Sequence, residues 1–254
     1  MSKVKETARV ISQEMIATNI YSMWIETSIA KDAAAGQFIS VYIKNPSKLL
    51  PRPISICEIE DNRLRIVYRI AGEGTKELSE YTEGDAIDIL GPLGNGFNAR
   101  EEAKTSILIG GGIGIPPMLQ LAKSIRGKKY IVVGYRDSEL FLSEELKKYG
   151  ELVVATDDGS CGTKGNVIDA IKEQGVSGDI IYACGPTPML RGVKSFAMEN
   201  GIDAYISMEE RMACGVGACL GCVCKSTQVD DHSKVNNKRI CKDGPVFLAT
   251  EVDI

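Results

Sequence analysis

Histidine and tryptophan are nearly absent from this chain, and neither sign of charge dominates it. Among 254 residues there is one histidine, His232, and one tryptophan. A catalytic mechanism or a metal site that needs two histidines therefore cannot be built within one chain. Lysine and arginine total 30 against 34 aspartates and glutamates, so the formal net charge is −4. Nucleic-acid-binding domains usually carry a basic excess, so no nucleic-acid partner is expected.

Long apolar runs are missing as well. The longest uncharged stretch lies between Lys104 and Lys123, and glycines and two consecutive prolines interrupt it. These residues fit a strand, a loop and a helix start, so no membrane segment is predicted. The polar N-terminus carries no secretory signal, which favours a cytoplasmic protein in a reducing compartment.

Residues 1–98 have the pattern of a β-rich domain. Short segments rich in β-branched residues alternate with turn residues, and helical periodicity is weak. This spacing predicts a small antiparallel barrel or sandwich. The predicted strands are Gln37–Ile43, Ile54–Ile56, Leu64–Ile70 and Ala86–Leu90.

Residues 99–207 change to buried strands alternating with amphipathic helices. That alternation is typical of βαβ units around a parallel sheet, whose ligands bind at the C-terminal ends of the strands. Strands are predicted at Ser106–Ile109, Tyr130–Val133, Leu152–Ala155, Ile180–Ala183 and Ala204–Ile206. Helices are predicted at Pro117–Ile125, Leu140–Tyr149, Val167–Gln174 and Pro188–Asn200.

Residues 208–254 form a third segment, too short for an apolar core of its own, and something other than packing is expected to hold it. It contains five of the eight cysteines. Cys214, Cys219 and Cys222 are spaced C-x4-C-x2-C, and Cys241 follows after 18 intervening residues. This is the spacing of plant-type [2Fe–2S] proteins, in which four thiolates surround the cluster.

Two other interpretations of these cysteines stay open. Zinc usually takes two short-spaced pairs, whereas here three thiols share one loop. Unligated core cysteines are the second alternative. Cys224 could replace Cys222 as a ligand, although the spacing favours Cys222.

Two glycine-containing turns in residues 99–207 suit a nucleotide. One contains Gly111, Gly112 and Gly114 between a predicted strand and a helix, where backbone N–H groups can bind a pyrophosphate. Proline replaces the third Rossmann glycine, so a plain strand-to-helix turn is the alternative. The other is Cys184-Gly-Pro186, in which the thiol could lie beside a nicotinamide ring or simply be buried.

Two turns in the β-rich region carry groups that bind diphosphates. Arg52-Pro-Ile-Ser55 supplies an arginine and a hydroxyl, and Gly72-Glu-Gly-Thr75 supplies glycine amides. Each alone is equally compatible with a solvated arginine or an ordinary turn.

Together and in this order, these motifs resemble the ferredoxin–NADP reductase superfamily. The run Met208-Glu-Glu-Arg-Met-Ala-Cys-Gly-Val-Gly-Ala-Cys-Leu-Gly-Cys-Val-Cys224, followed by Cys241-Lys-Asp-Gly-Pro-Val-Phe247, narrows the resemblance. It is similar to the electron-transfer subunits of NAD-dependent, type B dihydroorotate dehydrogenases. The resemblance covers essentially the whole chain.

The resemblance implies a multi-domain β plus α/β protein with FAD, NAD(H) and a [2Fe–2S] cluster. Residues 1–98 would be an antiparallel β-barrel that binds FAD, residues 99–207 a parallel-sheet α/β domain that binds NAD, and residues 208–254 a small cluster-binding segment. The implied flavin residues are Arg52, Pro53, Ile54, Ser55, Val67, Tyr68, Arg69, Gly74 and Thr75. The expected NAD-site residues are Gly111, Gly112, Gly114, Gly185 and Pro186 with Cys184 as the reactive-site thiol, and the cluster ligands are Cys214, Cys219, Cys222 and Cys241.

The implied function is electron relay in pyrimidine (UMP) biosynthesis, because the cofactors and not acid–base residues would carry the chemistry. Electrons would pass from the FMN of a separate dihydroorotate dehydrogenase catalytic subunit through the cluster and FAD to NAD, in a heterotetramer of two copies of each subunit. A reductase subunit of another complex, of the ferredoxin reductase, sulfide dehydrogenase or hydrogenase type, is the nearest alternative. A non-catalytic redox sensor stabilised by a metal is another.

Overall fold

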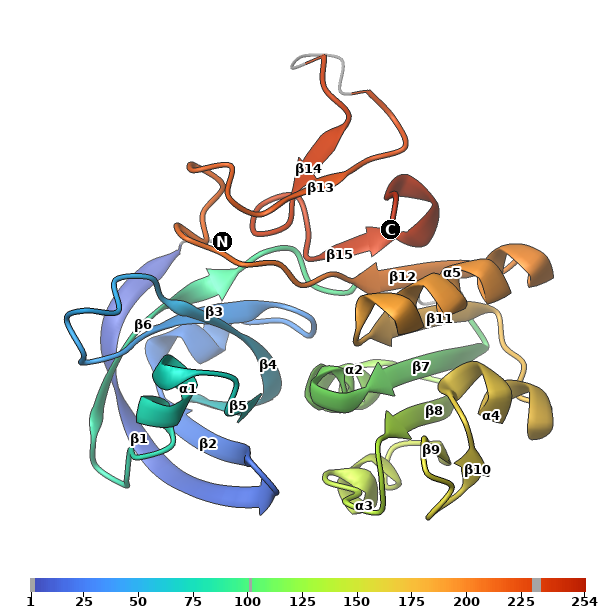
Figure 1. Cartoon of the computed structure of the whole chain (residues 1–254), viewed down its shortest axis with the longest axis horizontal. Coiled ribbons are helices and arrows are strands. Elements are labelled where there is room, and N and C mark those ends of the chain that lie inside the picture. Colours follow the sequence, from blue (N-terminus) through green and yellow to red (C-terminus); the bar gives the residue numbers. More distant parts are fainter. Residues whose placement is uncertain (1–2, 101, 230–233) are drawn as a thin grey trace.

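The computed structural model describes residues 3–100, 102–229 and 234–254, and His232 lies outside them. A β-barrel lies beside a parallel-sheet domain, and the C-terminal segment lies across the top of both (Figure 1). No helix within the described ranges is long and apolar enough to cross a membrane.

The barrel is closed and antiparallel, with strand order β1-β2-β5-β4-β3-β6. Alternate residues point inwards and bury a core of isoleucines that includes Ile25, Ile39, Ile56, Ile66 and Ile89. Closure removes all strand edges, which selects the barrel from the two predicted alternatives. The strands are β1 Val4–Ala17, β2 Ile20–Glu26, β3 Phe38–Tyr42, β4 Arg52–Glu60, β5 Arg63–Arg69 and β6 Ala86–Leu93.

Three elements of the barrel region were not among the predicted ones. Strand β1 buries only Ala8 and Val10, so its hydrophobic alternation is weak in the sequence. Strand β2 pairs over its whole length with β1, its neighbour in the chain, and with β5, which is distant in the chain, so its partners and not its own pattern fix it. Helix α1, Glu73–Leu78, is too short to show a helical period.

The second domain is a seven-stranded sheet of order β10-β9-β8-β7-β11-β12-β15. All its strands are parallel except β15, which pairs antiparallel with β12. Every predicted strand is present. The strands are β7 Thr105–Gly111, β8 Lys128–Tyr135, β9 Glu151–Thr156, β10 Thr163–Lys164, β11 Ile180–Cys184, β12 Asp203–Ser207 and β15 Val246–Leu248.

Three of the four predicted helices of this domain are close to expectation, and one is much shorter. The helix predicted at Leu140–Tyr149 is reduced to a single turn, because Leu142 adopts the left-handed conformation (φ 63°) and blocks an earlier start. The helices are α2 Pro116–Ser124, α3 Ser143–Leu146, α4 Val167–Glu173 and α5 Thr187–Asn200, with 3-10 turns at Ser28–Asp32, Gly112–Gly114 and Ala249–Glu251.

The C-terminal segment is not held by a ligand set alone. It forms a two-stranded sheet from β13, Val223–Lys225, and β14, Asn237–Arg239, and then adds β15 to the edge of the large sheet. Phe247 and Ile240 are buried within the same apolar cluster as the sheet core. The expectation that packing contributes little to this segment is therefore wrong: the segment shares the core of its neighbour.

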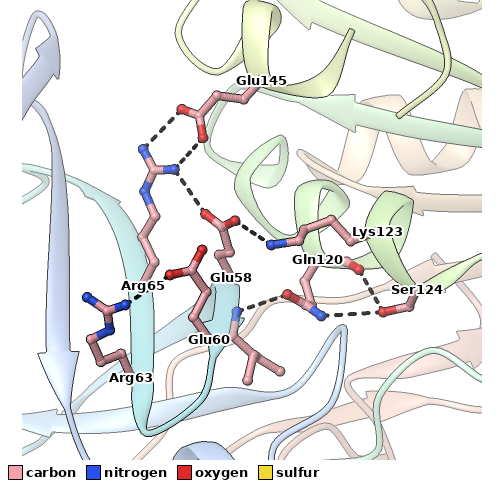
Figure 2. A network of polar contacts seen from close by, with 9 residues as sticks. Glu58, Glu60, Arg63, Arg65, Gln120, Lys123, Ser124 and Glu145 are labelled. Atoms are coloured by element: carbon pink, nitrogen blue, oxygen red, sulfur yellow. Dashed lines mark hydrogen bonds and ion pairs between the residues drawn. The ribbon is translucent and has the colours of Figure 1, made fainter. Parts of the chain in front are cut away.

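A network of buried charges joins the barrel to the sheet domain (Figure 2). Arg65 of β5 binds Glu58 of β4 (Nη1–Oε2 3.2 Å) and Glu145 of α3 (Nη1–Oε2 2.6 Å). The second oxygen of Glu58 accepts a hydrogen bond from Lys123 of α2 at 2.7 Å. Gln120 of α2 also accepts the backbone N–H of Ile59 at 2.9 Å. Two helices of one domain are thus tied to two strands of the other.

Candidate cofactor-binding site

A cleft of about 620 Å³ lies where the barrel, the sheet domain and the C-terminal segment meet. Strands β4 and β5 form one wall, and residues 208–212 form another. Ile113 reaches it from the turn after β7, and Pro245 from the turn before β15. All three parts of the chain therefore contribute to one binding space.

Eight of the nine predicted flavin residues line this cleft, because the start of β4, the end of β5 and the start of α1 come together there. They are Arg52, Pro53, Ile54, Ser55, Val67, Tyr68, Arg69 and Thr75.

Gly74, the ninth, lies directly behind the lining. A Cβ atom at Gly74 would lie 2.0 Å from Nε of Arg52, so only glycine lets the Arg52 side chain pack across this turn. The guanidinium of Arg52 also donates a hydrogen bond to the carbonyl oxygen of Leu50. The Thr75 hydroxyl accepts the backbone N–H of Ala71 at 2.8 Å, which closes the turn at the start of α1. Arg52 is thus held at the edge of the cleft.

The lining combines apolar and cationic groups. Phe38, Val67 and Met212 offer apolar surface, while Arg52 and Arg69 supply positive charge. Such a mixture suits a ligand with a flat apolar ring and anionic groups, since arginine binds phosphate with two parallel hydrogen bonds. The residues present therefore fit FAD.

Tyr68 is fixed from behind by the barrel. Its hydroxyl donates a hydrogen bond to Oε1 of Gln13 at 2.6 Å, and its ring stacks on Tyr21 with centroids 6.0 Å apart. Burial raises the pKa of the Tyr68 phenol well above its usual range. Tyr68 therefore presents a neutral, rigid edge to the cleft.

The two predicted nucleotide turns lie side by side at the C-terminal ends of β7 and β11. A Cβ atom at Gly114 would lie 2.3 Å from the carbonyl oxygen of Cys184, and one at Gly111 would lie 2.4 Å from Sδ of Met189. A Cβ at Gly185 would meet the same methionine at 2.5 Å. These glycines are needed for close packing of the two turns, independently of any ligand.

The nucleotide turns also adjoin the cleft. Gly112 has φ +53°, and a Cβ there would lie 3.5 Å from Nη2 of Arg69. Pro186 is the N-cap residue directly before α5. A nucleotide bound over these turns would therefore reach the cleft at Arg69 and Ile113.

Cys184 is fully buried and is not part of the cleft lining. Burial and the Glu209 carboxylate raise the pKa of its thiol, while a hydrogen bond with Ser207 lowers it less. The thiol is therefore protonated at neutral pH. Its neighbours Ser207 and Glu209 do line the cleft, so Cys184 lies one layer behind it. A role beside a nicotinamide stays a prediction.

The four predicted cluster ligands lie in two pairs. The Cys219 thiol donates to Cys214, and the Cys241 thiol donates to Cys222. The backbone N–H of Cys241 also points at Sγ of Cys222, at 3.4 Å. A [2Fe–2S] cluster takes two ligands on each of two irons, so paired thiols fit it. Within the described ranges, no group of three or more His, Cys, Asp or Glu side chains is placed to hold a metal ion.

Backbone N–H groups are already aimed at the first pair. Val216 and Ala218 donate to Sγ of Cys214 at 3.4 and 3.3 Å. Burial raises the pKa of the Cys214 thiol, but these hydrogen bonds and those from Cys219 outweigh it and lower the pKa. The loop thus stabilises a thiolate, which is the form that binds iron.

The alternative ligand, Cys224, lies on β13 opposite Lys238. Burial raises the pKa of its thiol, as it also raises that of Cys241, so the pKa does not separate Cys224 from the predicted ligands. Because Cys222 and not Cys224 receives the N–H of Cys241, the geometry favours Cys222.

The sequence interpretation assigned no role to part of the cleft wall. Met208–Met212, Phe38 and Pro245 all line it. Met208–Met212 lie just before the cysteine motif, and this position in the chain was the signal that could have indicated a role in the cleft. Phe38 gave none, because it reaches the cleft only through tertiary packing, whereas Pro245 lies within the run Cys241–Phe247 that carried part of the resemblance.

Comparisons with known proteins agree with this arrangement. Residues 209–253 match the family model described as the iron–sulfur cluster binding domain of dihydroorotate dehydrogenase B, and residues 108–195 match the oxidoreductase NAD-binding domain. A relative from Caldanaerobacter subterraneus subsp. tengcongensis is 43% identical over 249 residues, covering 98% of both chains. Another, from Fusobacterium nucleatum subsp. nucleatum, is 43% identical over 263 residues with the same coverage. Both are described as "Dihydroorotate dehydrogenase B (NAD(+)), electron transfer subunit".

A solved structure of an NADH-dependent reduced ferredoxin-NADP oxidoreductase, from work on flavin-based electron bifurcation, superposes with a TM-score of 0.87. It is 30% identical, and the match covers 98% of this chain and 90% of that one. A ferredoxin NADP⁺ reductase from Neisseria gonorrhoeae, with bound FAD and NADP, shares the fold at 15% identity and a TM-score of 0.67.

Barrel, sheet and paired cysteines define an oxidoreductase of the ferredoxin reductase fold that carries an iron–sulfur cluster. Within that class, the chain belongs to the family of electron transfer subunits of dihydroorotate dehydrogenase B (NAD(+)). The predicted cofactor set of FAD, a [2Fe–2S] cluster and NAD(H) is thereby confirmed, as is the predicted fold class.

Proposed function

We propose that this chain carries electrons from the FMN of a dihydroorotate dehydrogenase catalytic subunit to NAD⁺, through its own [2Fe–2S] cluster and FAD. The cleft carries this proposal. It is lined by the barrel, by the nucleotide turn and by the segment that leads into the cysteine motif. Sites for a flavin, a nicotinamide nucleotide and a cluster therefore adjoin each other.

Each part of the chain has a separate task in this scheme. Arg52, Ser55 and Thr75 hold the anionic part of FAD, while Val67 and Tyr68 support its ring. The remaining residues of the proposed flavin set are Pro53, Ile54, Arg69 and Gly74. FAD, when bound, links one-electron transfer at the cluster to two-electron hydride transfer with NAD.

The other two sites complete the assignment. Gly111, Gly112 and Gly114 offer backbone N–H groups to the NAD pyrophosphate, with Gly185 and Pro186 beside them and Cys184 behind the nicotinamide. Cys214, Cys219, Cys222 and Cys241 hold the cluster. The corresponding division of the chain is residues 1–98, 99–207 and 208–254.

The partner is an FMN-containing catalytic subunit, and two copies of each subunit form a heterotetramer in the cytoplasm. The names of the relatives support a partner, since an electron transfer subunit needs another chain that holds the substrate. The overall reaction is oxidation of dihydroorotate to orotate in pyrimidine biosynthesis.

Reconstitution tests the proposal. The holoprotein alone should oxidise NADH with an artificial dye and should show no activity on dihydroorotate. Adding the catalytic subunit should produce NAD⁺-dependent dihydroorotate oxidation, and loss of the cluster should abolish that activity while sparing much of the dye reaction. Dihydroorotate oxidation by the chain alone, or no coupling with the partner, would overturn the assignment.

A second candidate has its own support. The structure with a TM-score of 0.87 is that of an NADH-dependent reduced ferredoxin-NADP oxidoreductase, so a reductase subunit that exchanges electrons with ferredoxin is the alternative. Rapid NADH-dependent reduction of ferredoxin by the holoprotein, without coupling to the catalytic subunit, would favour it.

A further inference from the structure

Arg239, the last residue of β14, connects the two halves of the cysteine-rich segment. Its Nη1 donates a hydrogen bond to the carbonyl oxygen of Gly217 at 3.2 Å. The Asp243 carboxylate accepts hydrogen bonds from Nε (3.2 Å) and Nη2 (3.3 Å) of the same guanidinium. It also accepts the backbone N–H of Arg239 at 2.8 Å. The Arg239 side chain is only 29% exposed. The Asp243 carboxylate therefore fixes the direction of the Arg239 guanidinium, which donates to the Gly217 carbonyl.

The peptide that Arg239 contacts belongs to the proposed cluster loop. The Gly217 carbonyl and the Ala218 N–H are the two ends of one peptide unit, and this N–H donates to Sγ of Cys214 at 3.3 Å. On the preceding peptide, the N–H of Gly217 hydrogen-bonds the thiol of Cys241. The two peptides that flank Gly217 therefore contact Cys214, from the first cysteine pair, and Cys241, from the second.

The orientation of Gly217 depends on its having no side chain. It has φ +85°, and a Cβ atom there would lie 2.7 Å from Cδ of Lys242. A charged donor on a peptide oxygen polarises the N–H at the other end of the peptide and strengthens the bond that this N–H makes. Hydrogen bonds to cluster sulfurs stabilise the reduced, more negative cluster and so raise its reduction potential.

We propose that Arg239, held by Asp243, is a positioning residue for the [2Fe–2S] centre: it orients and polarises the Gly217–Ala218 peptide onto Cys214 and thereby raises the reduction potential of the cluster. This inference rests on the proposed ligand set. It assigns to Arg239 no contact with substrate, FAD or NAD.

The test is a redox titration of the holoprotein followed by the EPR signal of the reduced cluster, with iron and FAD measured for each variant. Arg239→Gln should move the midpoint potential to more negative values at unchanged iron content. Arg239→Lys, which keeps the charge but loses the forked geometry, should move it less. Asp243→Asn keeps Arg239 but weakens the hydrogen bonds that orient its guanidinium, and it should move the midpoint potential in the same direction.

Lys242→Gln is the matched control, because Lys242 packs beside Gly217 and its loss removes one charge without removing the Arg239 hydrogen bond. An equal shift in Lys242→Gln would show a plain charge effect and overturn the proposal. A wild-type potential in iron-replete Arg239→Gln would overturn it too. If Arg239→Gln does not retain iron, an unchanged potential in both Arg239→Lys and Asp243→Asn decides against it.

An error in the proposed set of cluster ligands would give a different result from an error in the role of Arg239. Cys214→Ser should lose or alter the cluster signal if the proposed ligands are right. A wild-type signal in Cys214→Ser would refute those ligands and this inference with them. Loss of the signal in Cys214→Ser, together with unchanged potentials in the Arg239 variants, refutes Arg239 alone.

Discussion

The barrel and the C-terminal segment are attached to the same sheet domain by different kinds of contact. Side chains join the barrel to it, through an ion network in which Arg65 is only 8% and Glu58 only 9% exposed and through a shared apolar cluster that includes Cys57 and Val67. The C-terminal segment is attached through its backbone, by β15 on β12 and by the N–H of Met208, which donates to the carbonyl oxygen of Pro245 at 2.9 Å. The barrel is therefore docked onto the sheet, whereas the segment is part of it.

This difference has a consequence for how each region tolerates substitution. Backbone pairing does not depend on side-chain identity, so the segment can vary in sequence at its exposed positions but not at Ile240 and Phe247, which lie in the sheet core. A buried ion network needs every partner, because removing one leaves an uncompensated charge. The sensitive residues should thus be charged where the barrel meets the sheet, and cysteines and buried apolar residues in the segment.

The largest effect is expected from the cluster ligands. Cys241→Ser should remove the [2Fe–2S] centre, because Cys241 is buried and paired with Cys222. Iron per chain and the EPR signal of the reduced protein measure this. Cys224→Ser is the control and should retain both. Loss of the cluster in Cys224→Ser with retention in Cys222→Ser would reverse the ligand assignment.

Breaking the ion network should cost less but still be severe. Arg65→Met leaves Glu58 buried, and the free energy of unfolding should fall by about 3 kcal/mol, the lower end for a broken buried pair, since Lys123 still binds Glu58. Arg63→Met removes an exposed pair with Glu60 and should cost less than about 1 kcal/mol.

Trp24 reports on both variants. The guanidinium carbons of Arg63 and Arg65 lie 5.7 and 5.9 Å from the centre of its ring. Urea unfolding followed by its fluorescence, at equal cofactor loading, compares the two. Equal losses of stability would mean that burial of the network contributes nothing.

An intermediate effect is expected where the two regions meet at the cleft. Arg52→Ala removes a charge-assisted contact to a phosphate, about 1.5–3 kcal/mol, or roughly ten- to hundredfold weaker binding of FAD. Flavin retained after dialysis, together with a fluorescence titration of the stripped protein, gives the affinity. Wild-type affinity would remove Arg52 from the flavin site.

The smallest effect is expected where the chain after β6 meets the C-terminal segment. Asn95 donates through its side chain to the carbonyl oxygens of Lys242 and Asp243, both at 3.1 Å. Because these bonds are exposed and the backbone bond from Asn95 to Gly244 remains, Asn95→Ala should cost only about 1 kcal/mol. Amide exchange should speed up in β15 and stay unchanged in β7. Release of the whole segment would show that side chains, not the backbone, hold it.

Sequence patterns predicted those parts of the molecule whose structure is determined by residues close together in the chain. Strands such as Ile180–Ala183 were recognisable because a parallel sheet buries both faces of its strands. The cysteine motif was recognisable because the cluster requires its ligands at that spacing. Strand β1 was missed because its partners, and not its composition, determine it. The Arg65–Glu145 contact lay beyond prediction, since it joins residues 80 positions apart on different domains.

The walls of the cleft emerge from the ribosome at very different times. Phe38 and the flavin residues of the barrel are synthesised early, while Pro245 follows only after the whole nucleotide domain and the cysteine motif. A nascent barrel can therefore offer FAD an open surface but not an enclosed site. We therefore expect capture of the flavin to be completed only after Pro245 has been made, so a product that stops short of Pro245 should have an incomplete flavin site.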